Sequence, residues 1–449
     1  MRRRACRAFR YSWMIARQTL FALLVGAICG LVGAAFLWSM RACSTAFERS
    51  VTHGLGNLIF LPGLGLLIVF MYRTTRQRLD AGVNQILEAA QQRGHASLWL
   101  APLIFLSSSL TQVGGGSAGR EGAALQLGGC LGLALARLER LTGVRLHVAT
   151  LSGMAGGFAA VFGAPLSAAV FALEVACVGV LYYPALLATL TSATIAASIP
   201  RWLHLEWTSY PSLSATACGP TMAFKALALG LVCGLACQFF CITIRVWARV
   251  YARTFSNEYL RALFGALLVA LGTWIVGDFS YNGTGQLLVE RALSGQAHGY
   301  DFILKTLFTA ATLAAGFKGG EIVPALAVGA TLGCAAAPLW GIEPTFAAAL
   351  AMTAVFGGAT HCPLAALAMG VELFGAANAL PFALACAASY VTSGHLGLYR
   401  SQRALFPLLD AERFDATDRR ELLRYLRLMV ERRDPEQIVK NESEGKKNR

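Results

Sequence analysis

Charged residues are scarce in this 449-residue chain: Asp, Glu, Lys and Arg together make up 14% of it, whereas 56% of the residues are hydrophobic. A chain of this length with so little charge is not an ordinary soluble protein. Its apolar runs are separated by short polar or basic stretches, and several are long enough to cross a bilayer. We therefore predict a multi-pass membrane protein. The runs include residues 19–40, 58–72, 222–244, 262–276 and 380–390.

Acidic residues are fewer than basic ones: the chain has 24 Asp and Glu and 38 Lys and Arg, which gives a net charge of +14. A basic excess can indicate nucleic-acid binding, but here arginines cluster before the first apolar run, so we predict no nucleic-acid partner. Basic residues beside spans mark the cytoplasmic side of a membrane. We expect both termini in the cytoplasm of a bacterium and the spans in its inner membrane. Residues 1–17 form a basic N-terminal segment, and residues 403–449 form a C-terminal helix and tail.

Histidine and carboxylate ligands are missing from the cysteine stripe of the sequence. Cys233, Cys237 and Cys241 follow one another at a spacing of one helical turn, with no other ligand at metal-binding distance in sequence. A metal site is one reading, but small packing residues are the favoured one, and no disulfide framework is implied. His361 and Cys362 are adjacent with no orienting acid evident, so we predict no enzyme activity, no metal and no cofactor.

The sequence repeats itself at a distance of about 200 residues. Residues 160–174 (AVFGAPLSAAVFALE) resemble residues 354–357 (AVFG) followed by 363–372 (PLAALAMGVE), with the two prolines 198 positions apart. A second set of matches lies 201 positions apart. We predict a first repeat at 18–210 and a second at 211–402. The second set pairs Gly119, Gly128, Leu131 and Gly132 with Gly320, Gly329, Leu332 and Gly333.

The placement of the basic clusters predicts that the two repeats are inverted. In the first half, Arg73, Arg76 and Arg78 follow the second span, whereas in the second half the cluster from Arg245 to Arg261 follows the first span. If basic loops face the cytoplasm, the two halves cross the membrane in opposite directions.

Residues 114–123 (GGGSAGREGA) are typical of an anion site. Glycines let backbone N–H groups turn toward a ligand, and the start of the following helix adds roughly half a positive charge. Glu121 is an ionisable residue in an apolar segment, and such residues are usually functional. When ionised it can occupy the anion site, and when protonated it can leave that site and carry a proton; the alternative is a simple helix cap. Arg120 either contacts the anion or forms a structural ion pair.

These motifs resemble the CLC chloride channel and transporter family. The resemblance is carried by residues 119–122 (GREG) with their glycine-rich lead and by residues 163–166 (GAPL) followed by 171–174, and it covers about residues 18–402. It implies an all-α integral membrane protein with an inverted-repeat fold of many tilted and broken helices, one pore per subunit and a homodimer. Glu121 falls on the gating glutamate of the family.

The sequence departs from the chloride-transporting members in three places. The first selectivity motif reads Asp80-Ala-Gly-Val-Asn, so Ala81 stands where a chloride-contacting serine is expected. Residues 316–321 (GFKGGE) resemble the fluoride-transporting branch, which makes Glu321 a second acid of the pore. Val175 stands where chloride/proton exchangers have an inner relay glutamate, so Glu321 is the candidate proton carrier. Val323 stands where the fluoride-transporting branch has a hydroxyl residue.

The resemblance therefore implies a proton-coupled fluoride exporter, with a chloride-selective CLC channel or Cl⁻/H⁺ exchanger as the alternative. Its partners are fluoride or chloride, protons, the bilayer and a second subunit. Glu121 and Glu321 are the predicted gating and proton-coupling residues. Tyr399 either lines the pore or anchors at the interface, Lys318 either attracts anions or extends to the interface, and Glu174 and Glu372 are predicted polar anchors. The predicted anion-binding residues are Ala81, Gly82, Val83, Asn84, Ala118, Gly119, Arg120, Gly122, Gly320, Ile322, Val323 and Tyr399.

Overall fold

The computed structural model describes residues 2–51, 56–79, 82–91, 96–205, 207–208, 210–214 and 219–404. Within these ranges the chain forms sixteen α-helices and one pair of two-residue parallel strands, β1 (Cys177–Val178) and β2 (Arg403–Ala404). The predicted all-α class is confirmed. The predicted helix and tail at 403–449 lie almost entirely outside the described residues.

The first eight helices are α1 (Arg2–Val51), α2 (Leu61–Thr74), α3 (Gly82–Ala90), α4 (Leu100–Val113), α5 (Glu121–Leu138), α6 (Gly143–Phe162), α7 (Pro165–Glu174) and α8 (Leu186–Trp202). The next eight are α9 (Pro220–Thr254), α10 (Glu258–Val276), α11 (Gln286–Leu293), α12 (Asp301–Ala314), α13 (Ile322–Trp340), α14 (Pro344–Thr360), α15 (Pro363–Phe374) and α16 (Ala379–Ser393). Four short 3₁₀ helices complete the described chain: η1 (Gly56–Phe60), η2 (Tyr183–Ala185), η3 (Phe279–Tyr281) and η4 (Ala376–Asn378).

The order of helices repeats after α8. α4 and α12 begin 201 residues apart, as do α5 and α13, and α7 and α15 begin 198 residues apart. Repeat-equivalent helices also touch: α2 packs against α10, and α7 packs against α15. The boundaries at 18, 211 and 402 stay a prediction, and α1 runs through residues 17 and 18 without a break.

Reciprocal hydrogen bonds join the two repeats, as a two-fold relation between them requires. The Glu174 carboxylate accepts hydrogen bonds from Leu364 N (3.3 Å) and Ala365 N (3.0 Å) at the start of α15. Glu372 accepts the equivalent bonds, at 2.8 and 2.7 Å, at the start of α7. Each carboxylate thus satisfies two N–H groups that a helix start leaves unpaired. These are the contacts of polar anchors.

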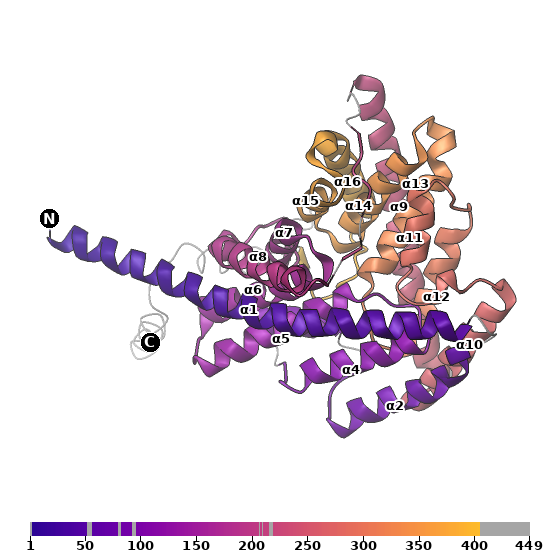
Figure 1. Cartoon of the computed structure of the whole chain (residues 1–449), viewed down its shortest axis with the longest axis horizontal. Coiled ribbons are helices and arrows are strands. Elements are labelled where there is room, and N and C mark those ends of the chain that lie inside the picture. Colours follow the sequence, from indigo (N-terminus) through magenta and orange to yellow (C-terminus); the bar gives the residue numbers. More distant parts are fainter. Residues whose placement is uncertain are drawn as a thin grey trace, which may run out of the picture.

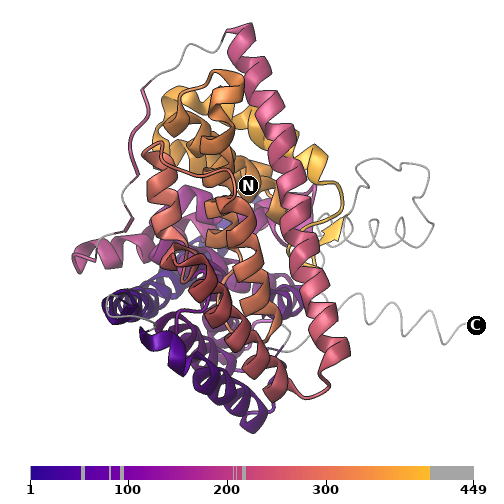
Figure 2. The same cartoon turned by 90° about the vertical axis from the view of Figure 1, so that its right-hand side faces the viewer.

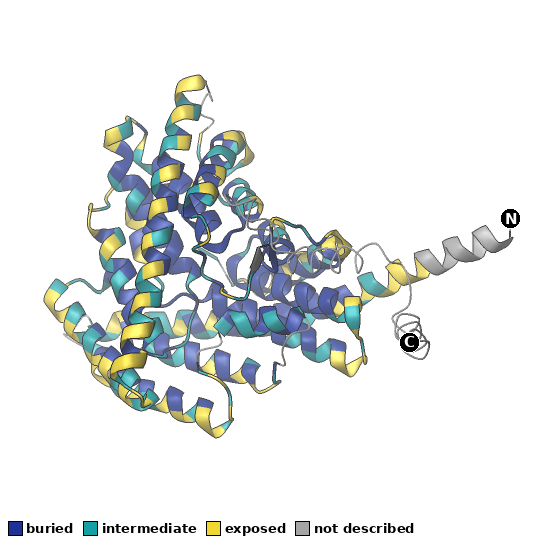
Figure 3. Ribbon diagram, turned by 180° about the vertical axis from the view of Figure 1, so that it is seen from behind, coloured by how far each residue is buried: buried dark blue, intermediate teal, exposed yellow. Residues whose placement is uncertain are grey.

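Small residues set the close helix packing around the centre. A Cβ atom at Gly128 of α5 would lie 2.1 Å from the Gly153 carbonyl oxygen of α6, and one at Gly329 of α13 would lie 2.5 Å from the Ala351 carbonyl oxygen of α14. Both helix pairs therefore need glycine where their backbones meet. Most residues of each of these four helices are buried, and Figure 3 shows that the buried residues gather inside the helical body.

Apolar side chains also cover the outside of the molecule. Leu231 and Leu235 of α9 and Leu267 and Leu271 of α10 are exposed. Six helices of the described chain are long and apolar enough to cross a membrane. Figure 1 shows the N-terminal part of α1 projecting beyond the helical body, and Figure 2 shows α9 running along one side of it. With 50 residues, α1 is about 75 Å long, more than twice the roughly 30 Å of a hydrocarbon core.

Candidate anion and proton site

The starts of α5 and α13 meet at the centre of the molecule. Gly119 N donates to Gly320 O at 2.7 Å, and Gly320 N donates to Gly119 O at 2.6 Å, so the two equivalent glycines form an antiparallel bridge. A Cβ atom at Gly122 would lie 2.7 Å from Gly320 Cα. Only glycine allows this approach. It brings the positive ends of two helix dipoles together, which favours an anion between them.

Glu121, the first residue of α5, is 1% exposed. One of its carboxylate oxygens accepts a hydrogen bond from Arg120 N, and the other pairs with Arg120 Nε, both at 3.1 Å. Arg120 Nη2 also donates to Thr208 Oγ1 at 3.4 Å. The sequence allowed either an anion contact or an ion pair for Arg120, and the structure contains the ion pair, which Arg120 forms with Glu121. The carboxylate therefore sits where backbone N–H groups and a guanidinium hold a negative charge.

A small cavity of about 10 Å³ adjoins Glu121, and Thr284 and Gln286 at the start of α11 form part of its wall. This volume is close to that of one water-sized sphere. The space beside the carboxylate therefore suits a single small ion or water molecule.

Glu321 is placed at the other helix start, as the residue that precedes α13. Its Oε2 atom is buried and has no hydrogen-bond partner within the described chain. A Cβ atom at Gly122 would lie 3.7 Å from this oxygen, so the carboxylate flanks the glycine bridge. Glu321 also lines a cavity of about 100 Å³ together with Gly82, Gln126 and Lys318. A buried carboxylate oxygen with no partner among the described residues marks Glu321 as a candidate functional acid.

The start of α3 lies against the segment that carries Tyr399. Asn84 Oδ1 accepts hydrogen bonds from Ser401 N at 3.1 Å and from Ser401 Oγ at 2.7 Å. Tyr399 is 5% exposed, and its hydroxyl has no partner among the residues that are described. Ala81 lies outside the described residues.

The predicted residues form two groups that the cavity lined by Gly82 and Glu321 connects. The roles assigned to them in transport stay predictions. Lys318 donates from Nζ to Leu79 O and lies over the Tyr72 ring at 4.6 Å, near the first residue of α3. The bridge group comprises Ala118, Gly119, Arg120, Glu121, Gly122, Gly320, Glu321, Ile322 and Val323. The α3 group comprises Gly82, Val83, Asn84 and Tyr399.

Lys305 of α12 is a central residue that the sequence analysis missed. It is 0% exposed, and Nζ donates to Ser117 Oγ at 2.9 Å, Tyr281 O at 3.1 Å and Gly283 O at 3.0 Å. Ser117 precedes the bridge by two residues. The available signal was a lone lysine in the apolar stretch 302–315, since an ionisable residue within a membrane segment points to function by default.

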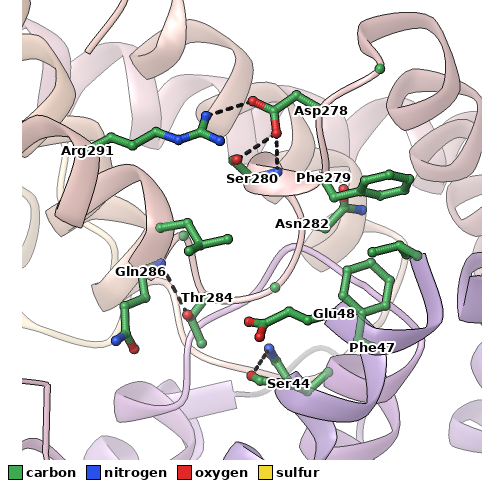
Figure 4. Close-up of a pocket in the computed structure, with 16 residues that line it drawn as sticks. Ser44, Phe47, Glu48, Asp278, Phe279, Ser280, Asn282, Thr284, Gln286 and Arg291 are labelled. Atoms are coloured by element: carbon green, nitrogen blue, oxygen red, sulfur yellow. Dashed lines mark hydrogen bonds and ion pairs between the residues drawn. The ribbon is translucent and has the colours of Figure 1, made fainter. Parts of the chain in front are cut away.

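A larger cavity of about 280 Å³ lies between the end of α1 and the loop that leads into α11; we call it the loop cavity. Figure 4 shows Asp278 to Gln286 on one side of it and Ser44, Phe47 and Glu48 on the other. Asp278 pairs with Arg291 at 2.8 Å. Thr284 and Gln286 line both this cavity and the small cavity beside Glu121. They therefore form the partition between the loop cavity and the candidate gate.

Residues 64–394 match the family model described as voltage gated chloride channel. The chain belongs to the CLC family. Within it, this CLC chain is 33% identical over 396 residues to the chloride/fluoride channel protein of Pseudomonas syringae pv. tomato, covering 87% of each protein. It is 25% identical to the H⁺/Cl⁻ exchange transporter of Cronobacter sakazakii, over 79% of this chain and 81% of that protein.

Solved structures agree with this placement. A CLC-type fluoride/proton antiporter superposes with a TM-score of 0.82 at 31% identity, covering 87% of this chain and 99% of its own. A cyanobacterial Cl⁻/H⁺ antiporter superposes with a TM-score of 0.74 at 19% identity, over 93% of this chain and 99% of its own, which supports the fold alone. The resemblance inferred from residues 119–122 and 163–174 is thus confirmed at the level of family and fold.

Proposed function

We propose that this CLC protein exports fluoride from the cytoplasm in exchange for protons. The observation that carries the proposal is the pair of carboxylates, Glu121 and Glu321, on either side of the Gly119–Gly320 bridge. The positive ends of two helix dipoles favour the binding of an anion, and two buried carboxylates can carry a proton. The proposal is supported by the likeness to the chloride/fluoride channel protein and to the fluoride/proton antiporter.

Glu121 couples the two ions because its two states exclude each other at one place. Ionised, it holds the position at the start of α5 where Arg120 N and Arg120 Nε donate to it. Protonated, it loses the attraction of Arg120 and leaves the position to fluoride. With one anion moving out and one proton moving in, two positive charges shift inward, which an inside-negative potential assists by about 4.6 kcal/mol per 100 mV.

The test is simultaneous recording of fluoride flux and pH in proteoliposomes. Glu121→Gln should abolish proton movement driven by a fluoride gradient while the protein still elutes as folded. Glu321→Gln should weaken it. Glu139→Gln is the matched control, because Glu139 is half-exposed and pairs with Arg17 at 3.7 Å, away from the bridge. Fluoride-driven proton uptake that persists in Glu121→Ala would remove this residue from the mechanism.

A chloride-selective channel or Cl⁻/H⁺ exchanger is the second candidate, favoured by several relatives at 25–31% identity that are named chloride channels or exchangers. Fluoride and chloride efflux from the same vesicles separates the two.

We infer that selectivity is set at Ala81, Ile322, Val323 and Tyr399, because a small hydrated anion needs close dipoles to replace its water. If Ala81→Ser, Ile322→Gly and Tyr399→Ala all leave the fluoride-to-chloride ratio unchanged, that assignment is wrong.

We also propose that the protein is a homodimer in a bacterial inner membrane, with both termini in the cytoplasm. Six helices of the described chain that are long and apolar enough to span a membrane, together with bacterial relatives, support the membrane location. Labelling of single cysteines at each end, in intact cells and in lysed cells, tests the orientation. Light scattering of the detergent-solubilised protein tests the dimer, and a monomeric mass refutes it.

A further inference from the structure

Lys305 is a buried lysine whose hydrogen-bond partners in the described chain are all neutral groups. Within the described chain, no carboxylate forms an ion pair with it, and its three hydrogen bonds go to a hydroxyl and two backbone carbonyls. Three acceptors are one for each hydrogen of an ammonium group. Asp301, one turn earlier on α12, instead accepts from Tyr281 Oη at 2.5 Å and from His298 N at 2.8 Å.

The repeat shows that the fold itself does not need a lysine here. The residue 201 positions earlier, on the equivalent helix α4, is Ile104, which is buried at 2% exposure. One half of the molecule therefore fills this position with an apolar side chain, and the other half places a charge there. A charge in an apolar interior is expensive, so its retention in only one half points to a use on that side.

The position of the ammonium group identifies that side. Gly283 O accepts from Lys305 Nζ and also from Ala118 N at 3.1 Å, which ties the loop before α11 to the segment entering the bridge. A Cβ atom at Gly285 would lie 3.1 Å from Nζ, so the ammonium group lies against the loop segment from Gly283 to Gly285. Thr284, between these glycines, forms part of the partition between the loop cavity of Figure 4 and the cavity beside Glu121.

We propose that Lys305, whose Nζ has one acceptor for each hydrogen of an ammonium group, supplies the positive charge that sets anion affinity on the Glu121 side of the pore. The electric field of the ammonium group reaches the anion across the partition, and the hydrogen bonds of Lys305 hold the partition in place. Lys305 itself does not touch the anion. The loop cavity itself contributes the exposed Glu48 carboxylate and an Asp278 that Arg291 neutralises, so an anion crossing the partition needs a positive charge beneath it. This inference rests on the proposed anion transport and names a residue that governs it.

The decisive variant is Lys305→Gln, which removes the charge but keeps N–H donors for the two carbonyls. The initial rate of fluoride efflux from proteoliposomes is measured with a fluoride electrode over a series of sodium fluoride concentrations. We expect the half-saturating concentration to rise about tenfold, with the maximal rate within about twofold of wild type. Lys225→Gln is the matched control, because Lys225 is exposed and likewise donates to a backbone carbonyl, Gly341 O, at 2.9 Å. It should change neither quantity.

Two further variants separate charge from structure. Lys305→Arg keeps the charge, and Ser117→Ala removes one acceptor while leaving the lysine, so the half-saturating concentration should stay within about twofold of wild type in both. If Lys305→Gln does not elute as folded protein, these two variants decide: a tenfold rise in either overturns the proposal. A folded Lys305→Gln with unchanged half-saturation also overturns it. A wild-type protein that moves neither fluoride nor chloride instead refutes the proposed transport itself.

Discussion

The closest backbone approach at the candidate site gives a sharp test of its geometry. A Cβ atom at Gly320 would lie 2.4 Å from Gly122 N and 2.8 Å from Gly122 Cα. Both are backbone atoms, so no side-chain rotation can relieve the contact. In Gly320→Ala the starts of α5 and α13 must move apart by about 1 Å to reach an ordinary contact of 3.4 Å.

The expected effect on transport exceeds the effect on stability. Overpacking a well-packed position costs about 1–3 kcal/mol, which a bundle of this size tolerates. In enzymes a displacement of about 1 Å can cost roughly 100-fold in rate, and we expect a comparable loss where close dipoles must replace the water around an anion. The two hydrogen bonds of the Gly119–Gly320 bridge, at 2.7 and 2.6 Å, also cannot both survive such a shift. We therefore expect Gly320→Ala to remain folded and to transport fluoride about 100-fold more slowly.

The assay is fluoride efflux from proteoliposomes, with thermal unfolding of the purified protein measured in parallel. Gly63→Ala in α2 is the matched control, because a Cβ atom there meets nothing within 4 Å. It should transport normally and unfold at the same or a slightly higher temperature, since alanine favours a helix over glycine by about 1 kcal/mol. Efflux through Gly320→Ala at more than a third of the wild-type rate would show that the bridge does not position the transport site.

Two further predictions concern the contacts between the repeats. Glu174→Ala and Glu372→Ala should each destabilise the protein by about 1–3 kcal/mol, because each leaves the N–H group of a buried residue, Ala365 or Ser167, without its acceptor; thermal unfolding checks this, and Glu139→Ala is the exposed control. His361 ends α14 with a φ of +56°, where its equivalent on α6 is Gly163 with a φ of +80°, so glycine would relieve about 1–2 kcal/mol of backbone strain. The buried imidazole packs against the Tyr390 ring, and the cavity left by its removal costs about 2–5 kcal/mol, so His361→Gly should lower the unfolding temperature; a raised unfolding temperature would mean that backbone strain outweighs the packing of the imidazole.

Much of the fold was readable from the sequence because its determinants are local or periodic. The matched glycines at 119 and 320 and the matched prolines at 165 and 363 predicted an internal repeat of about 200 residues, and in the structure α7 and α15 begin at those prolines. The glutamates that follow them were assigned as anchors. Their partners across the repeat axis were not predictable, since a sequence gives spacing but not the distance between chain segments.

The candidate site was less completely readable. Glu121 and Glu321 stand out as acids in apolar segments, but their distinct surroundings depend on tertiary contacts. Glu121 pairs with the neighbouring Arg120, whereas an oxygen of Glu321 is left without a described partner. Asn84 stays a predicted residue of the anion site, and its amide oxygen accepts two hydrogen bonds from Ser401, 317 residues away, which the sequence did not predict. Such long-range contacts leave no local pattern.

The repeat offers a physical criterion for separating framework from function. Where the two halves carry the same residue, as at Gly119 and Gly320, the contacts are reciprocal and hold the halves together. A two-fold relation between identical residues creates identical surroundings, and a pore built that way would present the same groups to both faces of the membrane. Groups that serve only one side of the pore must therefore lie where the halves depart from each other. The departures cluster around the bridge: at 201 residues of separation Arg120 is matched by Glu321, and Ile104 is matched by Lys305.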